Sequence, residues 1–242
     1  MIVSWFSAGV SSAVATKIAL NKYGDVKIIY THIDDQHKDT LRFISDCKKW
    51  FGVPVEINQS ELKSVENACR KAGFINSPHG AACTRLLKRR VRQMWEMDKT
   101  TEECIYIWGF DCTEKDRADR VVLSMPECEH IFPLIDGNID KAAAHGILEA
   151  AGIKRPVMYD LGYPNNNCIG CLKGGMGYWN KIKVDFPEVY KSRCELENII
   201  GGKIFKDFNL IDLPENRGRM MPVIVPDCGL FCEIEAAQDV RQ

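Results

Sequence analysis

Five of the eleven cysteines stand in segments rich in loop-forming residues: Cys83, Cys168, Cys171, Cys228 and Cys232. Cys168 and Cys171 form C-x-x-C, the spacing at which a loop offers two thiolates to one metal centre. With the C-x-x-x-C of Cys228 and Cys232, this pair would complete a tetrahedral zinc site. Cys83 with three of the other thiolates would instead hold an iron–sulfur cluster. The spacing leaves the choice between the two metals open.

The position of Cys83 in the chain favours a thiolate. It opens a basic helix pattern that runs to residue 97, and a helix N-terminus lowers the pKa of a cysteine thiol. Such a thiol serves as a metal ligand or as a reactive group. Four other cysteines lie within helix or strand patterns and have no partner at ligand spacing, so we expect them to be buried core residues: Cys47, Cys69, Cys104 and Cys194.

A second stretch that can do chemistry is I-V-S-W-F-S-A-G-V-S-S at residues 2–12. An apolar, β-branched run breaks into small residues before a helix pattern over 13–20, which predicts a buried strand leading through a loop onto a helix N-terminus. Unpaired N–H groups and the partial positive charge there favour phosphate or sulfate. The residues expected to hold the anion are Ser7, Ala8, Gly9, Ser11 and Ser12. The alternative is an ordinary turn with Ser11 as the helix N-cap.

Two more turns follow predicted strands and should lie beside that loop. The strand over 26–31 ends in an acidic turn containing Asp34 and Asp35, and the strand over 103–108 is followed by Gly109. Ligands of open α/β sheets bind outside the carboxyl ends of the strands. Either carboxylate can accept a hydrogen bond from a ribose hydroxyl or an adenine amine. The alternative for Asp35 is that it caps the helix predicted over 37–51.

Arg117 lies on the helix predicted after Gly109. Its guanidinium can offer a two-pronged contact to phosphate or sulfate oxygens, and the alternative is a plain surface arginine. The loop at residues 2–12 has neither the lysine of the P-loop pattern nor the G-x-G-x-x-G of dinucleotide-binding folds.

The elements that must position these residues alternate between strand and helix. Further strands are expected over 53–57 and 131–134, and further helices over 61–72, 139–151 and 187–199. This alternation predicts an α/β, Rossmann-like fold with a mostly parallel sheet, helices on both faces and a loop-rich, cysteine-containing tail. We expect one domain over residues 1–242, with the tail at 200–242 packed on it.

The composition is that of an ordinary globular protein. With 45% apolar and 27% charged residues and a net charge of -1, nothing in the whole-chain composition points to nucleic-acid or membrane binding. No apolar run reaches about 18 residues and no basic leader opens the chain, so we expect a cytoplasmic location. The odd number of cysteines argues against a disulfide framework.

Taken in order, these blocks resemble the sulfonucleotide (phosphoadenosine phosphosulfate) reductase family of the PP-loop adenine-nucleotide α-hydrolase superfamily. S-A-G-V-S-S is similar to the S-G-G-x-D-S loop of that superfamily, with Ala8 and Ser11 in place of Gly and Asp. H-I-D-D-Q-H-K-D-T resembles the segment after the second strand. G-F-D-C-T-E-K-D-R is similar to G-x-R-x-x-E-S-x-x-R, which aligns Gly109 and Arg117. P-L-I-D-G-N-I-D, and Y-D-L-G-Y before C-I-G-C, complete a resemblance that spans residues 1–179.

The resemblance implies a set of cluster ligands. Members with a [4Fe–4S] cluster pair a Cys-Cys with the later C-x-x-C. Here Thr84 follows Cys83, so three ligands are implied: Cys83, Cys168 and Cys171. Either Cys228 or Cys232 would supply the fourth. Alternatively, the fourth iron stays open to bind sulfide, as in cluster-dependent thiolases of the superfamily.

The resemblance also implies a nucleophile. Reductases of the family carry a cysteine in a C-terminal E-C-G-[LI]-H, and D-C-G-L-F at residues 227–231 is similar, with Phe231 in place of His. Cys228 would then attack the sulfur of a sulfonucleotide, and Cys232 would be left as a metal ligand. The intermediate would be resolved by an external dithiol such as a thioredoxin-like protein.

Three functions follow from the resemblance. The leading expectation is reduction of an adenylyl-sulfate substrate. The first alternative is an ATP-dependent sulfur transferase that adenylates an acceptor such as a nucleic-acid base. Ser11 weakens this alternative, because Mg²⁺ bound to a triphosphate needs oxygen ligands that Asp would supply. The second alternative is a nucleotide-binding or zinc-stabilised module without catalysis. Whether the protein forms a homodimer is left open.

Overall fold

The computed structural model describes residues 1–77, 80–97, 104–220 and 222–226. A five-stranded sheet of order β3-β2-β1-β6-β7 organises the chain, and each neighbouring pair of strands is parallel. The strands are β1 (Ile2–Trp5), β2 (Lys27–His32), β3 (Val55–Gln59), β6 (Ile105–Ile107) and β7 (Glu129–Ile131). The predicted α/β fold with a mostly parallel sheet is confirmed.

The strand order creates one topological switch point, between β1 and β6. From β1 the chain moves outward through β2 to β3, and it then returns to place β6 on the other side of β1. In an open parallel sheet the connections diverge where the order reverses, which leaves a crevice outside the carboxyl ends of the two central strands. The loops after β1 and β6 therefore face the same crevice.

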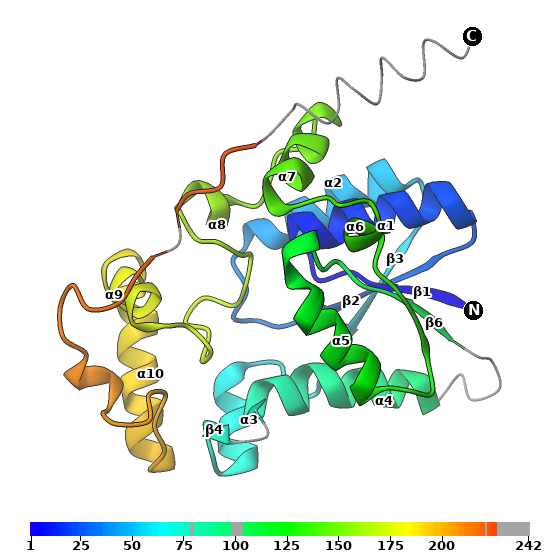
Figure 1. Ribbon diagram of the computed structural model, residues 1–242. Coiled ribbons are helices and arrows are strands. Elements are labelled where there is room, and N and C mark those ends of the chain that lie inside the picture. Colours follow the sequence, from blue (N-terminus) through cyan, green and yellow to red (C-terminus); the bar gives the residue numbers. More distant parts are fainter. Residues whose placement is uncertain (78–79, 98–103, 221, 227–242) are drawn as a thin grey trace, which may run out of the picture.

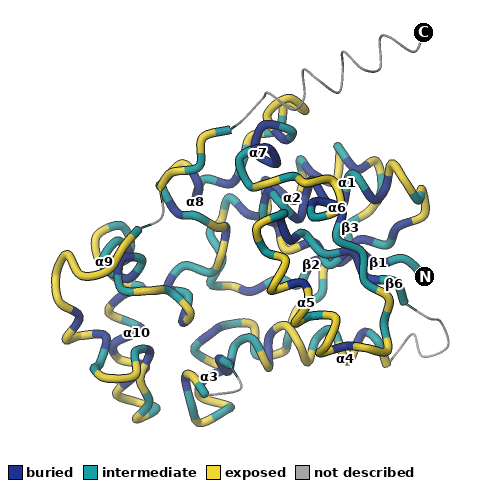
Figure 2. The backbone as a smooth tube through the Cα atoms, viewed as in Figure 1, coloured by how far each residue is buried: buried dark blue, intermediate teal, exposed yellow. Residues whose placement is uncertain are grey.

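Helices cover both faces of the sheet (Figure 1). Three helices pack on one face, around a core that includes Phe6, Val14 and Phe43, and they are α1 (Val10–Tyr23), α2 (Asp39–Phe51) and α7 (Lys141–Ala150). On the opposite face α4 (Arg90–Met97) packs Trp95 against β-strand residues. Figure 2 shows the buried backbone concentrated between these layers.

A second core lies beside the sheet. It is formed largely by α3 (Val65–Ala72), α9 (Met176–Asp185) and α10 (Pro187–Ile200), with the fully buried Trp179 among its members. The segment that follows α10 adds Ile204, Leu210 and Leu213 to it. Shorter elements complete the described chain: β4 (Asn76–Ser77), β5 (Gly80–Ala81), η1 (Thr84–Arg89), η2 (Cys112–Glu114), α5 (Lys115–Ser124), α6 (Pro133–Asp136), α8 (Val157–Asp160) and η3 (Leu210–Asp212). Among the described residues, no helix has the length and apolarity needed to cross a membrane.

Several predicted boundaries are wrong, and the reasons are local. The strand expected over 131–134 ends at Ile131, because Pro133 starts α6 at the first helical position, where a missing N–H costs nothing. The helix expected from residue 61 begins only at Val65, because the Ser64 side chain accepts a hydrogen bond from the Asn67 N–H and so caps it. The helix after the first loop begins at Val10, with Gly9 as its N-cap, so the alternative reading of Ser11 as N-cap is wrong.

Cysteine burial follows the prediction with one exception. Cys47, Cys69 and Cys194 are buried, as expected. Cys104 is only half-buried, because it stands just before β6 at the rim of the sheet rather than inside the strand.

Candidate functional site

The loop after β1 is wrapped around one side chain, that of Ser12. The Ser12 hydroxyl oxygen accepts hydrogen bonds from the N–H groups of Ser7 and Gly9, each at 3.2 Å, and from the Ser7 hydroxyl at 3.0 Å. It donates its own proton to the Gly9 carbonyl at 2.9 Å. These bonds hold residues 7–12 as a preformed turn. The Ser7 side chain is exposed and that of Ser11 half-buried, so both can reach a ligand at the rim of the turn.

Ala8 carries the sharpest bend of this loop. Its φ of 58° lies in the left-handed region, which is costly for a residue with a Cβ. Asn166, itself buried, donates from Nδ2 to the Ala8 carbonyl at 2.7 Å and to the Thr40 hydroxyl at 3.3 Å. The left-handed backbone at Ala8 is therefore stabilised by a hydrogen bond from the loop that leads to the C-x-x-C.

The start of α1 has a partner that sequence reasoning missed, Tyr159 on α8. Its hydroxyl oxygen accepts a hydrogen bond from the Val10 N–H at 3.3 Å, and the backbone of Asn166 also bonds to it. Burial raises the pKa of Tyr159, so the hydroxyl stays protonated. Its ring packs edge-on against His145, with 4.6 Å between the ring centroids. The only signal in the sequence was the place of this tyrosine in the block before the C-x-x-C.

Gly109 brings the end of β6 against the same loop. A Cβ built on Gly109 would lie 2.3 Å from Ser12 Cα and 2.7 Å from both Ser12 N and Ser12 Cβ. Real Cβ atoms essentially never approach other atoms so closely. Glycine is needed here because two backbones meet. The structure thus places the turns after β1 and β6 in direct contact.

Arg117 lies beside the Gly109 turn, on α5. Its Nη1 is 2.6 Å from Glu114 Oε1, and its guanidinium carbon lies 4.4 Å from the centroid of the Phe110 ring. The side chain is 58% exposed. The guanidinium is oriented by these two neighbours while much of it stays open to solvent, so it can also contact an anion.

The two acidic residues after β2 have different partners. Asp35 Oδ2 accepts from the Val65 N–H at 2.7 Å, and its Oδ1 forms an ion pair with the buried Arg193. The alternative that Asp35 caps α2 is wrong, because its carboxylate lies at the start of α3 instead. Asp34 is half exposed, and its Oδ1 accepts from Gln59 Nε2 at 2.6 Å. Of the two carboxylates, that of Asp34 has the more open access to a ligand.

The C-x-x-C forms a tight turn, which we call the cysteine knuckle (residues 168–171). The Ile169 N–H donates to the Asp35 carbonyl at 2.8 Å. The Tyr178 hydroxyl accepts from the Cys171 N–H at 2.9 Å and donates to the Cys168 carbonyl at 3.1 Å. These bonds come from the turn after β2 and from α9, so the knuckle is fixed to the same turn that carries Asp34.

The three described candidate ligands lie within electrostatic range of one another. Cys83 stands just before η1, a π-helical turn of a kind that is frequent at functional sites. Burial raises the pKa of Cys83 despite nearby Lys88, and the prediction of a lowered pKa is wrong because desolvation outweighs the helix terminus. Burial likewise raises the pKa of Cys168 to about 12, with Lys88 again opposing. The thiols of Cys83 and Cys168 are therefore protonated at neutral pH unless a cation binds.

A metal centre is not formed by the described residues as they stand. Within residues 1–77, 80–97, 104–220 and 222–226, no group of three His, Cys, Asp or Glu side chains could hold a metal ion. The predicted nucleophile Cys228 and the predicted ligand Cys232 lie outside the described residues. Thiols are suitable ligands for zinc or iron, but in this part of the chain Cys83, Cys168 and Cys171 do not form a group that could hold the metal.

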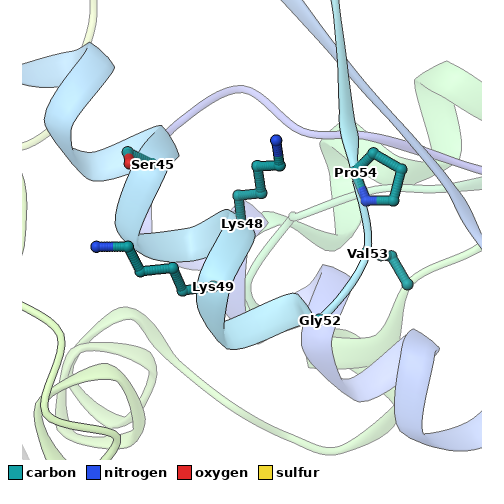
Figure 3. Close-up of a pocket in the computed structure, with 6 residues that line it drawn as sticks. All are labelled: Ser45, Lys48, Lys49, Gly52, Val53 and Pro54. Atoms are coloured by element: carbon teal, nitrogen blue, oxygen red, sulfur yellow. The ribbon is translucent and has the colours of Figure 1, made fainter.

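Two cavities adjoin the described elements. One of about 220 Å³ opens beside the cysteine knuckle and is lined by Cys168, Cys171, Lys173, Tyr178 and Arg219 among others. Another of about 550 Å³ lies at the end of α2, lined by Ser45, Lys48, Lys49, Gly52, Val53 and Pro54 (Figure 3). The cavity at the end of α2 contains none of the predicted site residues. The cavity beside the knuckle adds the cationic side chains of Lys173 and Arg219 to the two cysteines.

Comparison with known proteins places this arrangement in context. A family model described as the phosphoadenosine phosphosulfate reductase domain matches residues 1–174, a span that includes the loop after β1, the acidic turn, Gly109 and the cysteine knuckle. Among solved structures, the chain is similar to the phosphate complex of a phosphoadenylyl-sulfate (PAPS) reductase from Candida auris. The identity is 15% and the TM-score 0.48, covering 69% of this chain and 80% of that chain. A search of the curated proteins finds no match.

Proposed function

The chain belongs to the phosphoadenosine phosphosulfate reductase domain family, and from that premise we propose that it binds an adenine nucleotide and reduces an adenylyl-sulfate substrate. The observation that carries the proposal is one contact, the 2.7 Å hydrogen bond from Asn166 Nδ2 to the Ala8 carbonyl. Asn166 stands two residues before Cys168. This hydrogen bond thus links the loop after β1, which is suited to an anion, to the segment that carries the cysteine knuckle.

The nucleotide is proposed to lie across the carboxyl ends of β2, β1 and β6. The N-terminus of α1 and the hydroxyls of Ser7 and Ser11 would receive its phosphate or sulfate oxygens, since both favour negative charge. Arg117 would reach the same oxygens from α5. On the other side, the open carboxylate of Asp34 would accept from the adenosine.

The sulfur step is proposed for Cys228. Its thiolate would attack the sulfur of the sulfonucleotide, and the bond from that sulfur to the nucleotide phosphate would break, with the phosphate leaving with the electron pair. Cys228 would then carry an S-sulfo group. A dithiol of a thioredoxin-like partner would supply two electrons, releasing sulfite and becoming a disulfide.

The last described residues of the tail, 222–226, are held beside α8. Arg155 Nη1 donates to the Ile224 carbonyl at 2.9 Å, and its Nε donates to Asp160 Oδ1 at 2.7 Å. The tail is thus anchored beside α8, which also carries Tyr159.

A [4Fe–4S] cluster is proposed at the cysteine knuckle, with Cys83, Cys168, Cys171 and Cys232 as ligands and zinc as the alternative metal. When bound, such a group would supply a structural and electrostatic element beside the substrate. The raised pKa values of Cys83 and Cys168 mean that binding must release protons. Lys88, near both thiols, favours that release.

The test is an assay of anaerobically purified protein with adenylyl sulfate, its 3′-phosphate or ATP, each with a dithiol reductant. We expect sulfite from a sulfonucleotide and none from ATP, and iron rather than zinc on metal analysis. Cys228→Ser should abolish sulfite release. Cys128→Ser is the matched control, because that half-buried cysteine stands just before β7, at the opposite end of the strands from the crevice.

Four results would each contradict the proposal or a part of it. Sulfite release that is unchanged in Cys228→Ser would remove the nucleophile. Pyrophosphate released from ATP with an acceptor, and no sulfite, would favour the sulfur transferase. Nucleotide binding without turnover of any substrate would leave a binding module. One equivalent of zinc, with no absorbance from thiolate bound to iron, would refute the cluster alone.

A further inference from the structure

We propose that Cys104 and Cys128 form a reversible disulfide between neighbouring strands. The two residues stand immediately before β6 and β7. These strands are parallel, with Ile105 opposite Glu129. Cys104 and Cys128 lie one residue outside the paired residues, where the same register would set them opposite each other. The two thiols are close enough to interact electrostatically.

The side chains of the two cysteines share one face of the sheet. Residues two apart in a strand point to the same side. Cys104 therefore shares the face of Tyr106, and Cys128 shares that of His130. Tyr106 and His130 are opposite one another in the register, and their ring centroids are 6.2 Å apart. The contact between Tyr106 and His130, two residues further along each strand, thus predicts that the two thiols also lie in contact.

The spacing of neighbouring strands suits the bond. Strands in a sheet lie about 4.8 Å apart. Disulfides join residues whose Cα atoms are about 4.4–6.8 Å apart. Both side chains pack against the same cluster of Val3, Ile29 and Trp95. Both side chains are half-buried, so the pair is partly open to a small oxidant.

The oxidant is proposed to be a low-molecular-weight disulfide of the glutathione type. One cysteine thiolate attacks it, forming a mixed disulfide and expelling one thiol. The second cysteine thiolate then attacks the cysteine sulfur of that mixed disulfide and expels the second thiol. Two cysteine thiols are oxidised by two electrons, and one small disulfide is reduced to two thiols. A dithiol reverses the reaction.

The bond would close a ring around part of the candidate site. The segment between the two cysteines contains Gly109, η2 and Arg117 on α5. The two ends of this segment lie at the starts of the neighbouring strands β6 and β7. A disulfide would therefore join them at the amino edge of the sheet, opposite the crevice. The oxidised chain would hold this segment as a covalent loop.

The experiment uses the full chain, incubated with oxidised glutathione and alkylated, then digested without reduction for mass spectrometry. We expect a linked pair of peptides containing Cys104 and Cys128, lighter than their sum by two hydrogen atoms, to account for most of the Cys104 signal. Treatment with dithiothreitol should remove it. Because the readout is a covalent bond, it does not depend on the activity proposed above.

Variants separate this pair from other thiols. In Cys104→Ala, Cys128 should carry a glutathione adduct instead of the link, and Cys128→Ala should show the converse, so either variant suffices if the other fails to fold. Cys112→Ser, a half-buried cysteine inside the same segment, should leave the link unchanged. Glutathione on both cysteines of the wild-type chain without a link, or a link from Cys104 to Cys112, would overturn the proposal.

Discussion

Replacing Gly109 with alanine should force the end of β6 away from the loop after β1. The new Cβ would lie 2.3 Å from Ser12 Cα. Carbon atoms in contact ordinarily sit about 3.5–4.0 Å apart, so the two backbones must separate by about 1 Å. The atoms that clash belong to the backbone where β6 and α1 meet, so no side-chain rotation relieves the contact.

The expected cost follows from that displacement. Overpacking a well-packed core costs about 1–3 kcal/mol, and a clash between two backbones belongs at the upper end of that range. The displaced atoms are those of Ser12, whose hydroxyl holds the loop closed. If the same free energy is lost from nucleotide binding, affinity falls about 100-fold, since each 1.4 kcal/mol is about tenfold.

Two measurements check this prediction. Urea unfolding gives the change in the free energy of unfolding, provided that the m-value is unchanged. Calorimetric titration with an adenine nucleotide gives the change in Kd. Gly202→Ala is the matched control, because a Cβ there meets nothing nearer than 3.6 Å. If Gly109→Ala unfolds within about 0.5 kcal/mol of wild type and binds nucleotide equally well, the close approach and the site built on it are both refuted.

Two further predictions concern buried ionisable groups. Burial lowers the pKa of His145 to about 4, whereas the pKa in the unfolded chain is about 6.5. Between these pH values unfolding therefore takes up a proton. The free energy of unfolding should fall by up to about 3 kcal/mol as the pH drops from about 6.5 to about 4. His145→Leu should remove this part of the pH dependence in urea titrations, and an unchanged slope would contradict it. Arg193→Met should cost about 3–5 kcal/mol, because it leaves the Asp35 carboxylate unpaired. Adding Asp35→Asn should recover part of that loss, and strictly additive costs in a double-mutant cycle would refute the coupling.

The sequence was sufficient to predict the fold and the positions of the loops. Apolar periodicity identifies strands and helices, and their alternation implies a parallel sheet whose turns gather at one edge. That reasoning placed Gly109 and the loop at residues 7–12 in one crevice, and the structure has them in contact. Both inferences need only local patterns and a general rule of topology.

The partners of the polar groups could not be predicted in this way. Asp35 reads locally as a turn carboxylate, yet its ion-pair partner Arg193 stands 158 residues later on α10. The pKa of Cys83 was predicted with the wrong sign, because a helix terminus is visible in sequence while burial by a distant core is not. Likewise, Cys104 and Cys128 become neighbours only through the register of β6 and β7.

These distant contacts connect the loop after β1 and the cysteine knuckle mechanically. The turn after β2 presents Asp34 outward and Asp35 inward, and the backbone of Asp35 holds the knuckle through Ile169. On the other side, Asn166 holds the strained bend at Ala8. A shift of the knuckle must therefore move either the acidic turn or the loop after β1. Because packed elements resist small continuous shifts, binding at the thiols and binding at the loop after β1 should influence each other.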